Sequence, residues 1–147
     1  MSQVFFTDRD LGNLVPDLLR RAGIPVERHS EHFAPDAKDV EWLGEVAGRG
    51  WYVLTRDGRI RYKPNELAAV MTSGLGLFVL VGKARHGQLA ANVINTMPRV
   101  LGFIARTDRP FIAKVYRPSP PSLLRRADSP GRVELWMDGE RWRRGRG

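Results

Sequence analysis

Three aspartates, Asp8, Asp39 and Asp57, occupy positions at which α/β proteins commonly carry catalytic or metal-binding acids. Asp8 follows the apolar run of residues 4–7, and Asp57 follows the apolar run that begins at Trp51. Asp39 opens a segment with helical spacing. Ligands and metal ions collect at the carboxyl ends of strands, so acids that end two strands are candidates for one site. A single acid of this kind also caps the next turn, so the three are informative only together.

Grouped carboxylates suit a hard divalent cation. Mg²⁺ takes oxygen ligands and keeps several of its waters, and Mn²⁺ has similar preferences. Crowded carboxylates raise one another's pKa unless a cation is bound. Water on such an ion attacks a phosphodiester in line, while the ion neutralises charge on the phosphoryl oxygens. Candidates for holding substrate phosphates are the basic residues around Asp57, namely Arg56, Arg59, Arg61 and Lys63.

The composition is that of a basic globular domain. The 147 residues are enough for one domain with its own core. Lys and Arg number 24 against 16 Asp and Glu, and the net charge of +8 favours a polyanionic partner, above all nucleic acid. A solvated basic surface or an acidic protein partner is the alternative. No cysteine is present, which excludes disulfides and thiolate zinc sites. With no membrane-span run and no signal peptide, we expect a cytoplasmic protein without membrane association.

Apolar spacing predicts a chain that alternates strands and helices. Strand-like runs occur over residues 4–8, 24–29, 51–55, 77–81 and 111–115. Helical spacing occurs over residues 11–22, over a segment that starts at Asp36 or Asp39 and runs to Gly48, and over residues 64–71 and 84–105. Pro98 lies inside the last of these and predicts a kink or two helices, the second capped by Thr96. The alternation predicts an α/β fold with a mainly parallel central sheet and helices on both faces.

The stretch after Arg117 changes character and becomes rich in Pro and Arg. The dipeptide Asp138-Gly139 suits a type I′ turn and predicts a small hairpin over residues 133–142. Its two tryptophans, Trp136 and Trp142, either stack on RNA bases beside arginines or anchor the hairpin on the domain or on a partner chain.

Three motifs stand in order along the chain: FFTDRDLG at residues 5–12, DVEWL at residues 39–43 and GWYVLTRDGRIRYKPNEL at residues 50–67. Together they resemble the PIN-like fold, specifically the compact VapC-type toxins of the VapC45 PIN-like group. The resemblance covers about residues 4–117 and implies a three-layer sandwich. We therefore expect a PIN-like nuclease domain over residues 1–117, followed by a Pro- and Arg-rich extension over residues 118–147.

The resemblance implies a Mg²⁺-dependent endoribonuclease, with Mn²⁺ as a substitute ion, that is the toxin of a type II toxin–antitoxin pair. It implies that Asp8, Asp39 and Asp57 are catalytic metal ligands. Thr55 would orient a carboxylate or water, and Glu66 would hold the basic residues in place or serve the site directly. The implied partners are the RNA substrate and an antitoxin protein, DNA-binding and encoded beside the toxin, whose segment covers the acidic pocket. A homodimer is also expected.

Other donors near the three acids leave the ligand set open. Larger PIN nucleases carry a fourth acid near the third, and here the next acid after Asp57 is Glu66. Asp10 and Glu41 are further candidates, although helical spacing turns Glu41 about 200° away from Asp39. The three histidines show no metal-ligand spacing with other donors and are interpreted as surface or structural residues.

Two other hypotheses compete with the nuclease. FFTDRD also resembles the DxD of haloacid-dehalogenase-type phosphatases, in which Asp8 would be the nucleophile and Asp10 the general acid–base. That family follows DxD with x-Thr or x-Val, whereas Leu11-Gly12 follows here, and the sequence holds no convincing later Asp-Asp pair. The third hypothesis is a non-catalytic α/β domain that binds RNA or a protein without cleaving it.

Overall fold

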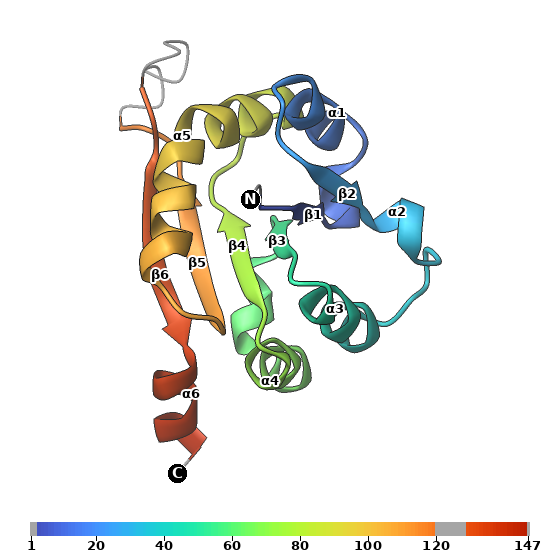
Figure 1. The fold of residues 1–147 in the computed structure, drawn as a ribbon, viewed down its shortest axis with the longest axis vertical. Helices are drawn as coiled ribbons and strands as arrows, with labels where there is room; N and C mark the ends of the chain where they lie inside the picture. Colours follow the sequence, from blue (N-terminus) through green and yellow to red (C-terminus); the bar gives the residue numbers. More distant parts are fainter. Residues whose placement is uncertain (1–2, 120–128, 147) are drawn as a thin grey trace.

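The structure is a computed structural model, and it describes residues 3–119 and 129–146. It is an α/β three-layer sandwich around a six-stranded sheet of order β2-β1-β3-β4-β5-β6 (Figure 1). The strands are β1 (Phe5–Thr7), β2 (Val26–Arg28), β3 (Tyr52–Thr55), β4 (Gly76–Leu80), β5 (Phe111–Tyr116) and β6 (Arg132–Asp138). Neighbouring strands are parallel except β5 and β6, which are antiparallel. The mainly parallel sheet that the sequence predicts is confirmed.

Helices cover both faces of the sheet, as predicted. They are α1 (Leu14–Arg21), α2 (His29–His32), α3 (Asp39–Gly48), α4 (Pro64–Ser73), α5 (His86–Arg106) and α6 (Gly139–Arg146), with two 3₁₀ turns, η1 (Arg9–Leu11) and η2 (Gly58–Tyr62). One apolar cluster joins the sheet to α1 and α5, and a second joins its other face to α3 and α4. Within the described ranges, no helix is long and apolar enough to cross a membrane.

Successive residues of the central strands point to opposite layers. Phe5 and Leu54 pack with α1 and α5, whereas Phe6 and Val53 pack with α3 and α4. All four side chains are at most 1% exposed. A strand that is buried on both faces must be apolar throughout, which is why β1 and β3 are visible in the sequence as unbroken apolar runs.

A buried polar network fastens the start of β6 to α5. The Thr96 hydroxyl donates to Asn92 Oδ1 at 3.1 Å and accepts from the Gly131 N–H at 2.8 Å. Asn92 Nδ2 donates to the Tyr116 carbonyl at 3.1 Å. A Cβ at Gly131 would overlap that same carbonyl oxygen, so the close approach requires glycine there. The network therefore fixes the point at which the chain enters β6.

Helix α5 runs unbroken through Pro98, and Figure 1 shows that it bends along its length. Pro98 lacks the N–H that would donate to the carbonyl four residues earlier, which accounts for a bend without a break. The prediction that Thr96 caps a second helix is wrong, because its hydroxyl is used in the buried network with Asn92 and Gly131.

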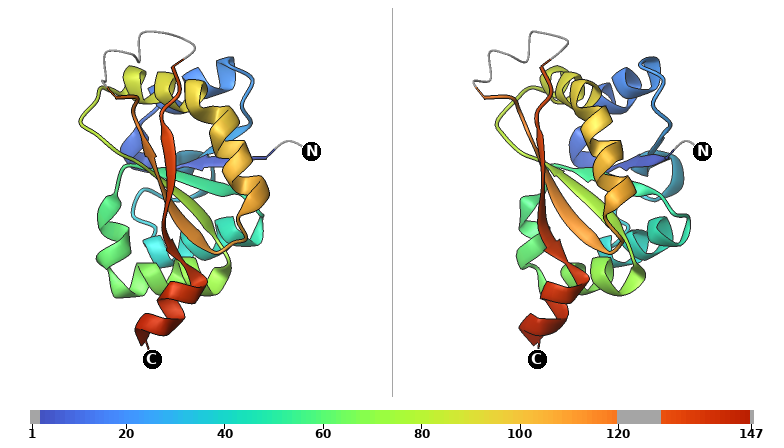
Figure 2. Two further views of the ribbon diagram at one scale, coloured as in Figure 1. Left: turned by 90° about the vertical axis from the view of Figure 1, so that its left-hand side faces the viewer. Right: turned by 60° about the vertical axis from the view of Figure 1, so that its left-hand side comes forward.

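The hairpin predicted over residues 133–142 is wrong in its second half. Residues 132–138 form β6, but residues 139–146 form α6, which continues beyond the end of the strand (Figure 2). Asp138 Oδ1 accepts from the Arg141 N–H at 2.8 Å, as a helix cap does. Gly139 also lacks the positive φ that a type I′ turn requires. Because β6 completes the sheet, part of the predicted extension is integral to the fold, and the division at residue 117 stays a prediction.

The network around Thr96 predicts a measurable contribution to stability. Thr96→Val leaves the buried Gly131 N–H without an acceptor, so we expect a loss of about 1–3 kcal/mol in the free energy of unfolding, measured by urea denaturation. The matched control is Thr72→Val, because the exposed Thr72 hydroxyl also donates to a carbonyl, that of Ala68. The control should change stability by less than about 0.5 kcal/mol. Equal effects of the two substitutions would contradict a structural role for the network.

Candidate active site

The strand order reverses between β1 and β3. From β1 the chain moves through α1 to β2 on one side, then through α3 to β3 on the other side. The two connecting helices therefore lie on opposite faces, and such a switch point opens a crevice at the carboxyl ends of the strands. Asp8 follows β1 and Asp57 follows β3, at this edge. The Asp8 N–H donates to the Leu54 carbonyl at 3.0 Å, which ties the end of one strand to the other.

A cavity of about 490 Å³ opens at this edge. Four carboxylates line it, those of Asp8, Asp10, Asp39 and Asp57. The three acids singled out from the sequence thus share one cavity, together with Asp10, which was a candidate fourth acid. Glu41 is exposed on α3 and does not line the cavity.

The buried Thr55 hydroxyl lies at the centre of this group. Its Oγ1 is 2.9 Å from Asp8 Oδ2 and 3.0 Å from Asp10 Oδ2, and it accepts from the Asp57 N–H at 3.1 Å. A hydroxyl donates one proton, so it satisfies only one of the two carboxylates. The other contact requires a proton on that carboxyl group or a cation nearby.

The pKa of Asp8 reflects this crowding. Burial, followed by the negative charge of Asp10, raises the pKa of Asp8 from 3.8 to about 6, against hydrogen bonds from Thr55 and from the Arg9 N–H. A carboxylate that is hard to ionise in isolation is stabilised by a bound cation. Asp8 therefore has the electrostatic character of a metal ligand.

Asp57 has a different environment. Its Oδ1 accepts from the Arg59 N–H at 3.0 Å and from Arg59 Nε at 3.1 Å, and its Oδ2 lies 3.4 Å from Lys63 Nζ. Partial burial opposes ionisation, but the Arg59 hydrogen bonds and the Lys63 charge hold the pKa of Asp57 below its usual value. Asp57 thus caps η2 and stays ionised on the cavity wall.

Asp39 and Glu66 extend the acidic group from α3 and α4. Asp39 Oδ1 accepts from Trp42 Nε1 at 2.9 Å, and the Asp39 carboxylate lies near that of Glu66. Burial and the Asp39 charge raise the pKa of Glu66, while the Lys63 ammonium opposes them. Lys63 Nζ lies 4.0 Å from Glu66 Oε1, so this lysine joins Glu66 to Asp57.

The four predicted phosphate-binding residues separate into two pairs. Arg56 and Arg59 line the acidic cavity. Lys63 is held by Asp57 and Glu66, and the Arg61 guanidinium lies 5.4 Å from the Trp136 ring centroid. Only the first pair is therefore placed to meet a substrate beside the acids.

His29 is a wall of the cavity that sequence reasoning missed. It is 3% exposed and packs against Phe6, Phe33 and Trp42, and its Nδ1 has no hydrogen-bond partner within the described residues. Burial, followed by the charge of Arg9, lowers its pKa. The sequence predicts a strand that runs to His29, but residues 29–32 form α2, and a single helical turn is too short to leave a periodic signal.

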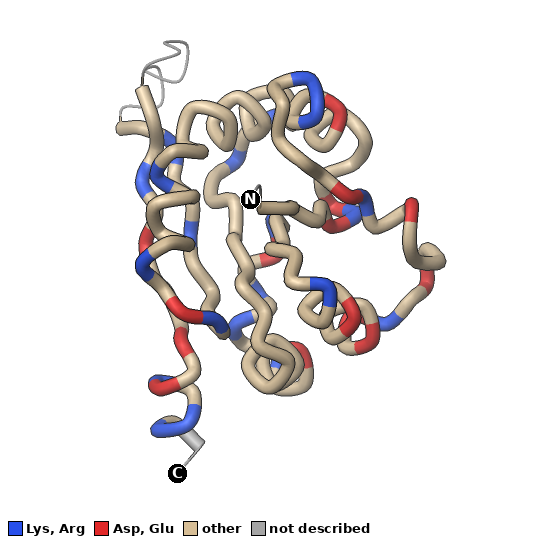
Figure 3. The backbone as a smooth tube through the Cα atoms, in the orientation of Figure 1, with Lys and Arg blue, Asp and Glu red and all other residues tan. Residues whose placement is uncertain are grey.

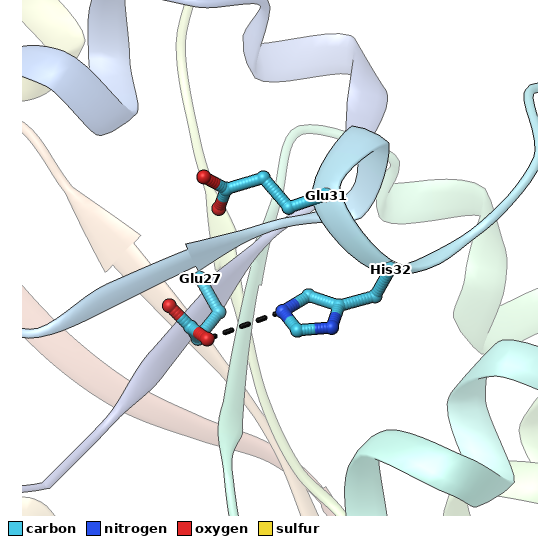
Figure 4. A group of neighbouring side chains, drawn as sticks. All are labelled: Glu27, Glu31 and His32. Atoms are coloured by element: carbon cyan, nitrogen blue, oxygen red, sulfur yellow. Dashed lines mark hydrogen bonds and ion pairs between the residues drawn. The ribbon is translucent and has the colours of Figure 1, made fainter.

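A second group of donors lies away from the cavity. Glu27, Glu31 and His32 place one donor atom each within 4.8 Å of one another, the one such group of three or more in the part of the chain that the structure describes (Figure 4). Arg20 Nη2 lies 2.6 Å from Glu31 and 3.6 Å from Glu27. Its hydrogen bond lowers the pKa of Glu31 to about 2. Arginine already neutralises this group, which makes it an ion-pair network.

The cavity residues fit a hard divalent cation. The four acids offer carboxylate oxygens, which Mg²⁺ prefers. No three of these acids place a donor atom each within 4.8 Å of one another. Mg²⁺ is commonly bound by one or two carboxylates and keeps several waters, so a loose set of acids suits it. The unsatisfied contact at Thr55 is the local feature that a cation would relieve.

Comparison with known protein families identifies part of the chain. A family profile described as a PIN like domain matches residues 3–82, a range that contains β1 to β4 and all four acids of the cavity. No curated protein matches the chain.

The raised pKa of Asp8 predicts a pH-dependent stability. Protonation favours the fold, so this contribution is present below the unfolded pKa of 3.8 and is lost as the pH rises through about 6. In EDTA at pH 8, Asp8→Asn should therefore raise the free energy of unfolding by up to about 3 kcal/mol. At pH 4 the gain should vanish.

Chemical denaturation at the two pH values checks this expectation. Asp36→Asn is the matched control, because Asp36 is exposed on the loop before α3 and does not line the cavity. A loss of stability in Asp8→Asn at both pH values would show that the Asp8 carboxylate supports the fold.

Proposed function

The chain belongs to the PIN-like domain family, and we propose that it is a metal-dependent endoribonuclease. The observation that carries this proposal is the convergence of four carboxylates from β1, η1, α3 and β3 on one cavity at the strand carboxyl ends. PIN-like domains are generally nucleases. A net charge of +8 also suits a polyanionic substrate.

Asp8, Asp39 and Asp57 are the proposed ligands of Mg²⁺, for which Mn²⁺ is a substitute. When bound, the ion supplies an activated water and neutralises charge on the phosphoryl oxygens. The Thr55 hydroxyl holds the Asp8 carboxylate from 2.9 Å. Asp10 lies 3.0 Å from the same hydroxyl and accepts from the Arg56 N–H at 2.9 Å, which makes it the proposed fourth acid.

The cationic residues of the site have two proposed roles. Arg56 and Arg59 contact the phosphates on either side of the scissile bond, because both line the cavity. Glu66 positions Lys63, whose ammonium lies 3.4 Å from Asp57 Oδ2 and keeps that carboxylate ionised. The Arg61 side chain acts further along the RNA.

We also propose that this nuclease is a VapC-type toxin of a type II toxin–antitoxin pair that acts on cytoplasmic RNA. The ordered motifs of residues 5–12, 39–43 and 50–67 support this assignment. The proposed antitoxin is a DNA-binding protein encoded beside the toxin. A basic segment of it would complement the four carboxylates and occlude the cavity. A homodimer is the proposed assembly of the toxin.

The phosphatase hypothesis has less support than the nuclease. The family match over residues 3–82 is to a PIN like domain. Asp10 Oδ2 accepts from the Thr55 hydroxyl and from the Arg56 N–H, contacts that fix the Asp10 carboxylate beside Asp8.

The test of the nuclease is cleavage of labelled single-stranded RNA with Mg²⁺, with EDTA and with the Asp57→Asn variant. We expect cleavage that EDTA abolishes and that Asp57→Asn lowers by about 100-fold or more, because one proposed ligand is lost. Asparagine still caps η2, so circular dichroism should show an unchanged fold.

Glu41→Gln is the matched control, because Glu41 is an exposed acid of α3 outside the cavity. It should cleave like the parent protein. RNA binding without cleavage in Mg²⁺ or Mn²⁺ would contradict the proposal and favour the non-catalytic domain. Turnover of a small phosphomonoester that stops in Asp8→Asn would favour the phosphatase.

A further inference from the structure

A second cavity adjoins the acidic one. It has a volume of about 510 Å³ and shares Arg56, Gly58 and Arg59 with the acidic cavity. Its floor is the carboxyl end of β4, residues 79–81, and its walls include Tyr62 and Trp136. We call it the aromatic cavity. The two cavities form one continuous surface along the carboxyl edge of the sheet.

Two aromatic rings form the walls. Tyr62 at the end of η2 is 68% exposed, which is unusual for so large a ring. Trp136 of β6 is half-buried, and the two ring centroids lie 5.8 Å apart at 79°. Cations already lie over the Trp136 ring, with Lys114 Nζ 3.9 Å and Arg61 Cζ 5.4 Å from its centroid. The exposed Tyr62 ring is therefore the surface on which another flat ring stacks, and Trp136 holds Tyr62 in place from the side.

The charges around the rings are all positive. Lys114 Nζ lies 3.9 Å from the Trp136 ring centroid. No acidic residue lines the aromatic cavity, whose charged residues are Arg56, Arg59, Lys83 and Lys114. Away from the cavity the charges are mixed, because Glu134, Asp138 and Glu140 lie among the lysines and arginines of β5, β6 and α6 (Figure 3). Aromatic faces beside cations are the chemistry that binds single-stranded nucleic acid.

The aromatic cavity is one residue from the candidate metal ligands. A Cβ built on Gly58 would lie 4.0 Å from Trp136 Cη2, and Gly58 follows Asp57 directly. Trp136 thus lies beside the turn that carries Asp57. A base that occupies the aromatic cavity therefore belongs to a nucleotide next to the phosphate held at the acids.

We propose that the aromatic cavity is a nucleobase-stacking subsite that selects single-stranded RNA and sets the position of the cut. The inference rests on the proposed nuclease function and gives Tyr62 and Trp136 the role of positioning residues. A paired base cannot enter the cavity without leaving its duplex, so the subsite discriminates against double-stranded RNA. Lys83 and Lys114 meet the backbone phosphates of the bound nucleotide.

RNA suits the aromatic cavity better than a protein segment does. A peptide that complements the acidic cavity is itself basic, and Lys83 and Lys114, which line the aromatic cavity and not the acidic one, would repel it. Single-stranded RNA offers phosphates to those cations and bases to the rings. A polyanion also reaches the acids only through such a cationic approach.

The test measures binding without cleavage, in EDTA and in the Asp8→Asn background. Asp8 is chosen because Asp57 caps η2, the element that carries Tyr62. The probe is a fluorescein-labelled 12-nucleotide single-stranded RNA, followed by anisotropy. Tyr62→Ala should weaken binding about tenfold, the loss expected for one base–aromatic stack. Tyr62→Phe keeps the ring and should restore most of the affinity.

Trp136→Leu provides the second variant. Trp51→Leu is its matched control, since Trp51 is also half-buried and also lies beside an arginine, with Arg49 Cζ 5.0 Å from its ring centroid, but at the amino end of β3. Trp136→Leu should weaken RNA binding and Trp51→Leu should not, with melting temperatures recorded for both. The exposed Tyr62 keeps the test valid if Trp136→Leu fails to fold.

An abasic scan makes the result specific to a base. Replacing one nucleotide at a time by an abasic ribose should identify a position at which the parent protein loses about tenfold in affinity and Tyr62→Ala loses nothing further. Unchanged RNA binding by Tyr62→Ala overturns the subsite, as does a loss confined to antitoxin binding.

The binding test of the stacking subsite and the cleavage test of the nuclease can fail independently of each other. If the abasic scan succeeds and the parent protein does not cleave RNA with Mg²⁺ or Mn²⁺, the nuclease fails and a base-binding cavity remains. If cleavage depends on Asp57 while Tyr62→Ala binds normally, the nuclease stands and the stacking subsite is wrong.

Discussion

The Thr55 hydroxyl has one proton to donate, and two carboxylate oxygens, those of Asp8 and Asp10, lie within hydrogen-bond distance of it. The arrangement of the acidic edge depends on how the fold keeps these two carboxylates together. Like charges at this distance cost free energy when no cation is present. The apolar layers above and below β1 and β3 hold the strand ends in place, because densely packed interiors yield little to local repulsion. The acids are thus kept in an arrangement that is unfavourable for the isolated fold and that a bound cation would stabilise.

The sequence predicts what depends on local pattern. β1 and β3 are buried on both faces and appear as unbroken apolar runs, so the acids that follow them could be assigned to one edge. The place of Asp10 in the site is harder to predict, because it depends on the 3₁₀ turn after β1, which brings the Asp10 carboxylate to the Thr55 hydroxyl. The prediction for residues 139–142, the second half of the expected hairpin, is wrong for a related reason. An Asp-Gly pair suits both a turn and a helix start, and the choice was made by tertiary packing, where Gly139 is buried beside Pro110.

Net charge alone does not distinguish the uses that this chain makes of its cations. Arg20 and Lys63 neutralise neighbouring acids within the fold. Lys114 and Arg61 lie beside an indole ring instead, 3.9 Å and 5.4 Å from its centroid. The net charge therefore counts together two groups of cations, those paired with acids and those beside an aromatic ring. Only the positions of the partners, which come from distant parts of the chain, separate the cations that are paired with acids from the cations that lie beside a ring.

The antiparallel strand β6 has a consequence for synthesis. Every acid of the cavity and the first five strands leave the ribosome before β6 does, because β6 begins at residue 132. Until then β5 is an open edge with unpaired backbone groups, which invites pairing with another chain. Trp136 also arrives only with β6. A nascent chain thus holds all four acids of the cavity before it holds the strand that completes the sheet, and the order of translation delays the finished fold.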